Sequence, residues 1–244
     1  MIITEALDFV ESEDMREVLT SRELPSMKEY FKVEALSNAK PCNNPPEKAA
    51  KYNNTGKAEQ IIEKKLTYSQ GGRQHLMHIL ECATATHLEN IFNQLPNGLF
   101  DSEIVESNRV FTSGACDIWG LDADGYFCIF ELKKKDNKPL GILSELFFYA
   151  AYAHEVLLNE KRLHDATEDY RGYGLLYDAV QKGVIKGIKA FFLLGSDAHR
   201  YIEEYKSELL AELDKNSFHI KFYFIKYDMN IIDGIDDSEI ITEV

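Results

Sequence analysis

The sequence predicts an α/β domain, in which a mixed central β-sheet is flanked by helices, behind an N-terminal helical extension. Three observations lead to this prediction: a β-hairpin signal in the middle of the chain, apolar runs of strand length around it, and amphipathic helical patterns between those runs. With 244 residues and 45% hydrophobic content, the chain can bury the core of one globular domain with an appendage.

The first quarter of the chain differs in composition from the rest. Residues 5–36 have the apolar spacing of one or two amphipathic helices, and residues 37–56 are rich in proline and asparagine, which is typical of a linker. We therefore expect residues 1–56 to form an accessory helical region and linker. Residues 57–244 are expected to form the core, with an acidic C-terminal tail.

Helices and strands alternate through the expected core. Helical patterns cover about 57–68 and about 74–94, the first ending before the Gly71-Gly72 pair and the second before Pro96. Strand patterns follow at 104–111, 114–120 and 126–133, and the last two are joined by an Asp/Gly turn at 121–125. An apolar helix near 144–150 and two later strands, 185–194 and 218–225, complete the pattern.

Charged residues interrupt the two apolar strands of the predicted hairpin. Glu131 and Lys133 project to the same face of the second strand, since side chains alternate along a strand, and Asp117 on the first strand can reach that face. An unpaired charge buried in a strand costs several kcal/mol or shifts its pKa. Two carboxylates and an ammonium group in a small volume suit the binding of a divalent cation beside a phosphate.

This pattern resembles the signature of the PD-(D/E)XK nuclease superfamily, which is an acidic residue, a hairpin and then acid-x-Lys. The downstream helix strengthens the resemblance, because many RecB-like members carry Gln-Leu-x-x-Tyr-Ala where this chain has Glu145 to Ala150, with Glu145 in place of Gln. The resemblance covers roughly residues 75–228. It implies a restriction-endonuclease-like core with the element order αβββαβ.

The activity implied by the resemblance is metal-dependent hydrolysis of phosphodiester bonds in nucleic acid, with DNA as the expected substrate, as in restriction, repair or defence. Asp117, Glu131 and a glutamate from a helix would hold Mg²⁺ or Mn²⁺. Lys133 would position or activate the attacking water and stabilise the developing negative charge.

The helix that precedes the first strand usually supplies the third acidic ligand in this superfamily. The expected helix over 74–94 offers Glu89 and Glu81, of which we prefer Glu89 because it is nearer the helix end. Glu145 is a supporting candidate as a partner of Lys133. Tyr149, on the same helix, is either a supporting residue or part of the core.

The net charge of −14 argues against tight binding to a duplex, because nucleic-acid-binding domains are usually basic. Lysines cluster locally after the motif, over 133–138, and again over 182–189. The alternative function is therefore a catalytically weak or inactive protein of the same fold that serves as a binding or assembly module. A homodimer, or a protein partner bound through residues 1–56, fits either function.

The sequence favours a reduced compartment away from membranes. No apolar run approaches the roughly 20 residues of a transmembrane helix, and the N-terminus does not resemble a signal peptide. Four scattered cysteines form no C-x-x-C pair, so we expect a cytoplasmic protein. His75, His78 and His87 are expected to be helix-surface residues rather than zinc ligands.

Overall fold

The fold is described from a computed structural model. The structure describes residues 40–41, 58–100, 103, 105–134, 139–159, 161–163, 171–195, 206–208, 210–211, 213–214, 220–236, 238 and 240. The expected accessory region over 1–56 therefore lies outside the described residues, apart from Lys40 and Pro41.

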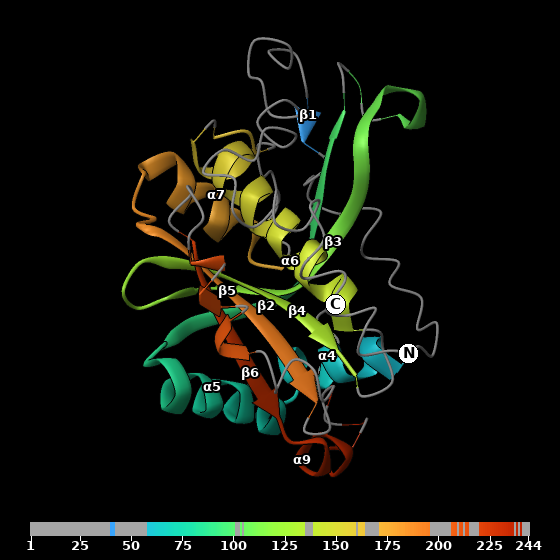
Figure 1. Cartoon of the computed structure of the whole chain (residues 1–244), viewed down its shortest axis with the longest axis vertical. Helices are drawn as coiled ribbons and strands as arrows, with labels where there is room; N and C mark the ends of the chain where they lie inside the picture. The colour runs from blue at the N-terminus through green and yellow to red at the C-terminus, as the bar shows by residue number, and fades with distance from the viewer. Residues whose placement is uncertain are drawn as a thin grey trace.

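A mixed six-stranded sheet forms the centre of the molecule, with its strands in the order β1-β2-β3-β4-β5-β6 (Figure 1). The strands are β1 (Lys40–Pro41), β2 (Leu88–Phe100), β3 (Arg109–Asp122), β4 (Tyr126–Lys133), β5 (Gly187–Gly195) and β6 (Lys221–Tyr227). Pairs from β1 to β4 are antiparallel, and β4, β5 and β6 are parallel. The predicted mixed sheet with flanking helices is confirmed.

Helices cover both faces of this sheet. The described helices are α4 (Ala58–Tyr68), α5 (Gln70–Thr84), the 3₁₀ turn η1 (Glu106–Asn108), α6 (Pro139–Tyr152), the π-helix η2 (Ala153–Asn159), α7 (Tyr173–Lys182) and α9 (Met229–Asp233). One buried apolar cluster joins α4 and α5 to one face, and another joins α6 and α7 to the opposite face (Figure 1). In the described part of the chain, no helix has the length and hydropathy needed to cross a bilayer.

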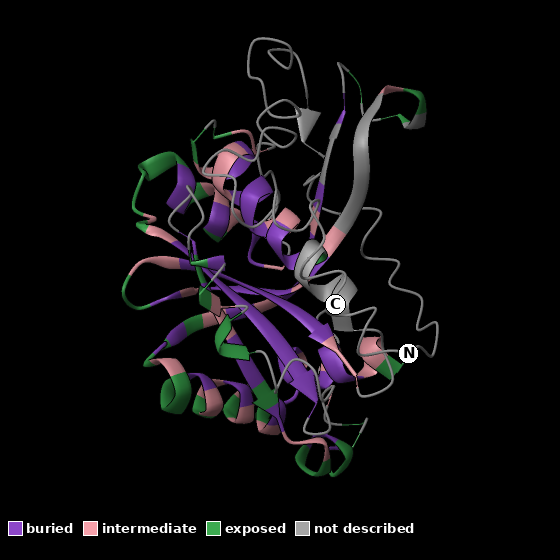
Figure 2. Cartoon of the chain, viewed as in Figure 1, coloured by how far each residue is buried: buried purple, intermediate pink, exposed green. Residues whose placement is uncertain are grey.

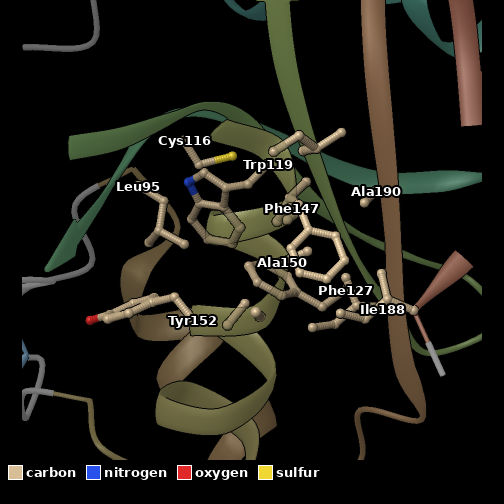
Figure 3. Close-up of a cluster of buried hydrophobic side chains, with 14 of the residues drawn as sticks. Leu95, Cys116, Trp119, Phe127, Phe147, Ala150, Tyr152, Ile188 and Ala190 are labelled. Atoms are coloured by element: carbon tan, nitrogen blue, oxygen red, sulfur yellow. The ribbon is translucent and has the colours of Figure 1, made fainter. Parts of the chain in front are cut away.

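The central strands are buried on both faces because helices pack against each side. Figure 2 shows β4 and β5 buried along nearly their whole length. Such strands read as continuous apolar runs rather than as alternating patterns. Trp119 of β3 is 1% exposed and packs against Phe92 and Phe127, with ring centroids 4.8 and 5.9 Å apart (Figure 3).

The predicted helix over 74–94 is wrong in its second half. Helix α5 ends at Thr84, whose hydroxyl donates to the carbonyl of Leu80, and Ala85 takes a left-handed conformation with φ 51°. Strand β2 then begins at Leu88, and η1 with the start of β3 occupies the region of the strand expected over 104–111. The alternation in β2 is hidden because two of its buried positions are asparagines, Asn93 and Asn97.

The predicted hairpin between the second and third long strands is confirmed. The Asp122 carboxylate accepts the Tyr126 N–H at 2.7 Å across the turn, where Gly125 has a positive φ of 86°. The register pairs Ile118 with Phe130 and thereby sets Asp117 beside Glu131 at the far end of the ladder. The hairpin therefore brings together charges that are 14 residues apart in the sequence.

Candidate active site

Asp117 and Glu131 lie side by side where the ladder between β3 and β4 ends. The regular pairing of these strands stops at Ile118 and Phe130, and beyond it the Asp117 Oδ2 accepts the backbone N–H of Leu132 at 2.9 Å. Glu131 is only 4% exposed. The local backbone thus fixes one carboxylate by a main-chain hydrogen bond and buries the other next to it.

Lys133 is the cation of this cluster. Its Nζ lies 2.7 Å from Oε1 of Glu131 and 2.9 Å from Oε2 of Glu145, which α6 places over the end of β4. The Lys133 and Glu131 side chains are largely buried, whereas that of Glu145 is 47% exposed. One ammonium group therefore faces three carboxylates, counting Asp117, and the cluster has an excess of negative charge.

Burial first, and then the neighbouring charges, shift the pKa values of Glu131, Asp117 and Lys133. Burial, followed by the charge of Asp117, raises the pKa of Glu131 far above its ordinary value. Burial also raises the pKa of Asp117, against the lowering effect of its hydrogen bond from Leu132 and of Lys133. Burial disfavours the charged form of Lys133, but Glu131 and Glu145 outweigh it and hold its pKa above the usual range.

Among the described residues, one oxygen of the cluster has no hydrogen-bond partner. Oε2 of Glu131 is buried and accepts no hydrogen bond, although Oε1 of the same carboxylate is bound by Lys133. A buried carboxylate oxygen without a donor costs free energy, and a hard cation such as Mg²⁺ binds such oxygens directly. Asp117 and Glu131 therefore fit the expected divalent cation in charge, atom type and placement.

Besides Glu145 of α6, a second helix carboxylate lies near this cluster: Glu59 of α4, which sequence reasoning missed. Oε1 of Glu59 accepts the backbone N–H of Lys134 at 3.3 Å, and Glu59 is one of the charges that raise the pKa of Asp117. Glu63 lies one turn further along α4 and is 2% exposed. The sequence did offer one indication of Glu59: α4, like α5, comes before the first long strand, which is β2.

Glu63 organises the strand next to Asp117 rather than pointing to solvent. Its carboxylate accepts the side-chain amides of Asn93 and Gln94, each at 2.8 Å. Asn93 pairs with Ile118 and Leu95 pairs with Cys116, so Gln94 lies opposite Asp117. Gln94 has a positive φ of 53°, which is unusual for a residue other than glycine. Strained backbone is often found at functional sites, where surrounding structure holds it in place.

Neither of the predicted helix glutamates belongs to the site. Glu89 is an exposed residue of β2, not of a helix, and its register lies near Asp122, on the order of 15 Å along the strands from Asp117. Glu81 is exposed in the last turn of α5 and lies 3.9 Å from His87. The Glu89 prediction failed because the helix was extended through the region that forms β2. The Glu81 prediction failed because α5 ends just before the start of β2, which pairs with Asp122 and not with the region of Asp117.

Tyr149 borders the cluster from α6. It is half-buried, and burial, followed by the charge of Glu131, raises the pKa of its hydroxyl well above the ordinary value. The Cys116 thiol, buried on β3, also has a raised pKa, through burial and then through Glu131 and Asp117. Tyr149 is therefore uncharged at neutral pH and borders the site. Cys116 is a core residue beside Trp119, and its thiol is unreactive (Figure 3).

The described residues provide two protein ligands more readily than three. No three His, Cys, Asp or Glu side chains converge to hold a metal ion within the part of the chain described above. Mg²⁺ often takes only one or two carboxylates and completes its shell with water and substrate phosphate. A pair of carboxylates is therefore chemically sufficient, with Glu59 and Glu145 as the helix carboxylates whose charges act on Asp117.

The histidines form no metal centre among the described residues. The Nε2 of His75 accepts the backbone N–H of Asp228 at 3.0 Å, and His78 lies 3.8 Å from the Cys82 sulfur. His75 and His78 lie on α5, whereas His87 follows it.

No family model, no curated protein and no solved structure matches this chain.

Proposed function

We propose that this chain is a metal-dependent nuclease with a restriction-endonuclease-like PD-(D/E)XK core, hydrolysing phosphodiester bonds of DNA. The observation that carries the proposal is the adjacent pair of the half-buried Asp117 and the buried Glu131 beside Lys133, in which Oε2 of Glu131 has no hydrogen-bond partner among the described residues. The element order from α4 and α5 through β2, β3, β4 and α6 to β5 also supports it, because it follows the αβββαβ order expected for this superfamily.

Asp117 and Glu131 would hold Mg²⁺ or Mn²⁺, and Glu59 of α4, whose charge acts on Asp117, could assist them. Such an ion supplies charge neutralisation at the scissile phosphate and a more acidic water. The Leu132 N–H fixes the Asp117 carboxylate, so its orientation does not depend on the ion. Burial of Glu131 keeps bulk water from competing for its free oxygen.

Lys133 would act as a cation and not as a proton acceptor. Its pKa is held above the ordinary range by two carboxylates, so it carries a proton throughout the neutral range. It can donate to a non-bridging phosphate oxygen and to the attacking water, which stabilises negative charge as it develops. To do so it must leave Glu145, the more exposed of its two partners.

A second candidate is a catalytically inactive protein of the same fold that acts as a binding or assembly module. Two observations favour it: Glu145 occupies Lys133 and adds negative charge where a phosphate would bind, and the whole chain has a net charge of −14. A module of this kind gains nothing from the unpartnered oxygen of Glu131, so metal binding separates the two candidates.

The test is calorimetric titration with Mg²⁺ and Mn²⁺, followed by a cleavage assay on supercoiled, linear and single-stranded DNA. The wild type is compared with Asp117→Ala, with Lys133→Ala, and with Asp124→Ala as a control at an exposed position of the hairpin turn. We expect Asp117→Ala to lose metal binding and both site variants to lose at least about a hundredfold in cleavage rate. Asp124→Ala should match the wild type.

The outcomes divide cleanly between the two candidates. Metal-dependent cleavage that Asp117→Ala and Lys133→Ala both lose would establish the nuclease. Binding of neither ion at millimolar concentration would favour the inactive module. Cleavage retained by either site variant would show that the reaction takes place elsewhere in the chain.

A further inference from the structure

Strand β3 departs from regular geometry at Asp117. Successive side chains of a regular strand point to opposite faces, so residues three apart lie on opposite faces. Cys116 and Trp119 nevertheless belong to the same apolar cluster, the one that joins α6 to the sheet (Figure 3). In the ladders that the structure describes, Asp117 pairs with neither β2 nor β4, and its carboxylate instead accepts the Leu132 N–H. The position of this carboxylate therefore depends on a local irregularity of the backbone.

Strand β2 has a matching irregularity at Gln94, directly across from the one in β3. Phe92 and Leu95 both pack on the α6 side of the sheet, whereas the side chains of Asn93 and Gln94 both bind Glu63 on the α4 side. The alternation fails because Gln94 has a positive φ of 53°, a conformation that is costly for a residue with a side chain. The backbone of β2 is therefore strained at the position opposite Asp117.

Helix α4 holds this strained segment through Glu63, which is 2% exposed. Oε1 of Glu63 accepts the Asn93 amide and Oε2 accepts the Gln94 amide, each at 2.8 Å. The Tyr68 hydroxyl of the same helix donates to the side-chain oxygen of Asn93. A carboxylate has two acceptor oxygens where a glutamine side chain has one, so Glu63 binds the two amides with separate atoms. Both oxygens of Glu63 are thus directed to β2, and any effect on the candidate site must pass through the backbone of that strand.

We propose that Glu63 is a positioning residue of the Asp117 and Glu131 site. By binding Gln94 it holds the left-handed backbone of β2, and this backbone sets the place from which Asp117 accepts the Leu132 N–H beside Glu131. The inference deepens the proposed function, because groups that orient the ligands of a metal ion strengthen its binding. It rests on that function for its metal-binding measurement, whereas its backbone measurement involves no metal.

Two measurements on the full chain test this role: exchange of the Leu132 amide by NMR without metal, and Mg²⁺ affinity by calorimetry. Glu63→Gln removes one of the two acceptor oxygens. Gln94→Ala removes the contact with Glu63 and keeps a side chain at the strained position. We expect each variant to speed exchange of the Leu132 amide about tenfold or more relative to the amides of β5, and to weaken Mg²⁺ binding by a similar factor.

Thr67→Val is the matched control on the same helix. The Thr67 side chain is also buried, and its hydroxyl donates to the Glu63 carbonyl within α4 at 2.8 Å. Its loss removes a buried hydrogen bond of the helix without touching the side chains of β2. We expect Leu132 exchange relative to β5, and Mg²⁺ affinity, to match those of the wild type.

Gln94→Gly separates the backbone conformation from the contact that holds it. The variant loses the Glu63 contact, as Gln94→Ala does, but glycine adopts a positive φ as readily as a negative one. We expect its Leu132 exchange and Mg²⁺ affinity to stay within about threefold of the wild type. Losses equal to those of Gln94→Ala would overturn the proposal, since the held backbone conformation would then not be what places Asp117.

A purely structural role for Glu63 gives a different pattern. Glu63→Gln and Gln94→Ala would then lower the stability as Thr67→Val does, with Leu132 exchange following that of β5 and Mg²⁺ affinity unchanged, and the proposal would be wrong. Absence of Mg²⁺ binding by the wild type would contradict the proposed function instead. In that case the Leu132 exchange of the metal-free variants alone supports or overturns the positioning role.

Discussion

Strands β3 and β4 bury charges at both ends of their hairpin, and the two sets differ in balance. At the turn end, Lys189 Nζ lies 2.6 Å from Asp122 Oδ2 and donates to the Thr86 hydroxyl at 3.2 Å. The other carboxylate oxygen of Asp122 accepts the Tyr126 N–H at 2.7 Å. The ammonium group also lies 4.8 Å from the centre of the Tyr126 ring. One positive and one negative charge are therefore buried with their hydrogen bonds made.

At the open end, the charges are not balanced. Lys133 is shared by Glu131 and Glu145, Asp117 lies next to them, and Oε2 of Glu131 has no donor. A buried charge cluster of this kind lowers the stability of the protein on its own. The charge of the Asp122 and Lys189 pair is therefore balanced within the protein, whereas Asp117, Glu131 and Glu145 share one ammonium group. In the proposed function, a divalent cation would supply the missing positive charge.

The largest effect on stability is expected at the balanced end. Lys189→Met leaves the Asp122 carboxylate buried without its cation, which should lower the free energy of unfolding by about 3–5 kcal/mol. Urea denaturation followed by circular dichroism measures this loss. Lys182→Met, which removes an exposed pair with Asp178, is the control and should cost under about 1 kcal/mol. A loss at Lys189 no greater than at Lys182 would remove the contrast between the two ends.

A smaller effect, of opposite sign, is expected at the unbalanced end. Glu131→Gln removes a buried carboxyl group whose second oxygen has no partner among the described residues and whose ionised form is disfavoured by burial and by Asp117, so the free energy of unfolding without metal should rise by about 1–3 kcal/mol. Urea denaturation with and without millimolar Mg²⁺ tests this. Mg²⁺ should stabilise the wild type and not the variant. Destabilisation of the metal-free protein by Glu131→Gln would instead give Glu131 a structural role like that of Asp122.

The features predicted correctly from the sequence are those with local signals. The hairpin carries its turn residues, its apolar strands and its charges within 20 residues, so Asp117, Glu131 and Lys133 could be grouped before their geometry was known. Their proximity, and the pairing of Lys133 with Glu145, agrees with that grouping. Local backbone pairing decides these positions, and sequence patterns report it directly.

The helix glutamate could not be predicted because it depends on where β2 begins. Residues between Thr84 and Leu88 leave the helix through the left-handed Ala85, a conformation that alanine rarely adopts and that no local pattern signals. The buried asparagines of β2 are tolerated through tertiary contacts, as Asn93 shows by donating to Glu63 of α4. The position of β2, and with it the position of the α4 carboxylates, therefore depends on hydrogen bonds between residues that are far apart in the sequence.

Glu145→Gln tests whether the third carboxylate belongs to the unbalanced cluster or merely lies over it. Glu145 is 47% exposed, so its loss should change the free energy of unfolding by only about 0.5–1 kcal/mol. The variant should bind a non-hydrolysable phosphorothioate oligonucleotide several-fold more tightly in Mg²⁺, because Lys133 no longer exchanges a carboxylate for a phosphate. Equal or weaker binding by the variant would mean that Glu145 does not compete with phosphate for Lys133.

The smallest effect is expected at a half-buried histidine outside both clusters, and it separates the pH dependence of the two clusters from that of the rest of the fold. Nε2 of His75 accepts the backbone N–H of Asp228. Burial lowers the pKa of His75, the charge of Asp228 raises it, and His78 lowers it further. A base with a lowered folded pKa stabilises the fold above its unfolded pKa of about 6.5, and that stability is lost as pH falls through the folded pKa. The loss should be a few tenths of a kcal/mol, because the half-exposed ring is screened by solvent.

Urea denaturation of His75→Gln, which keeps an acceptor that does not titrate, should show a shallower decline in the free energy of unfolding between pH 7 and pH 5 than the wild type. An unchanged slope would assign the acid sensitivity to other titrating groups, and the carboxylates at the open end of the hairpin would be the first to substitute.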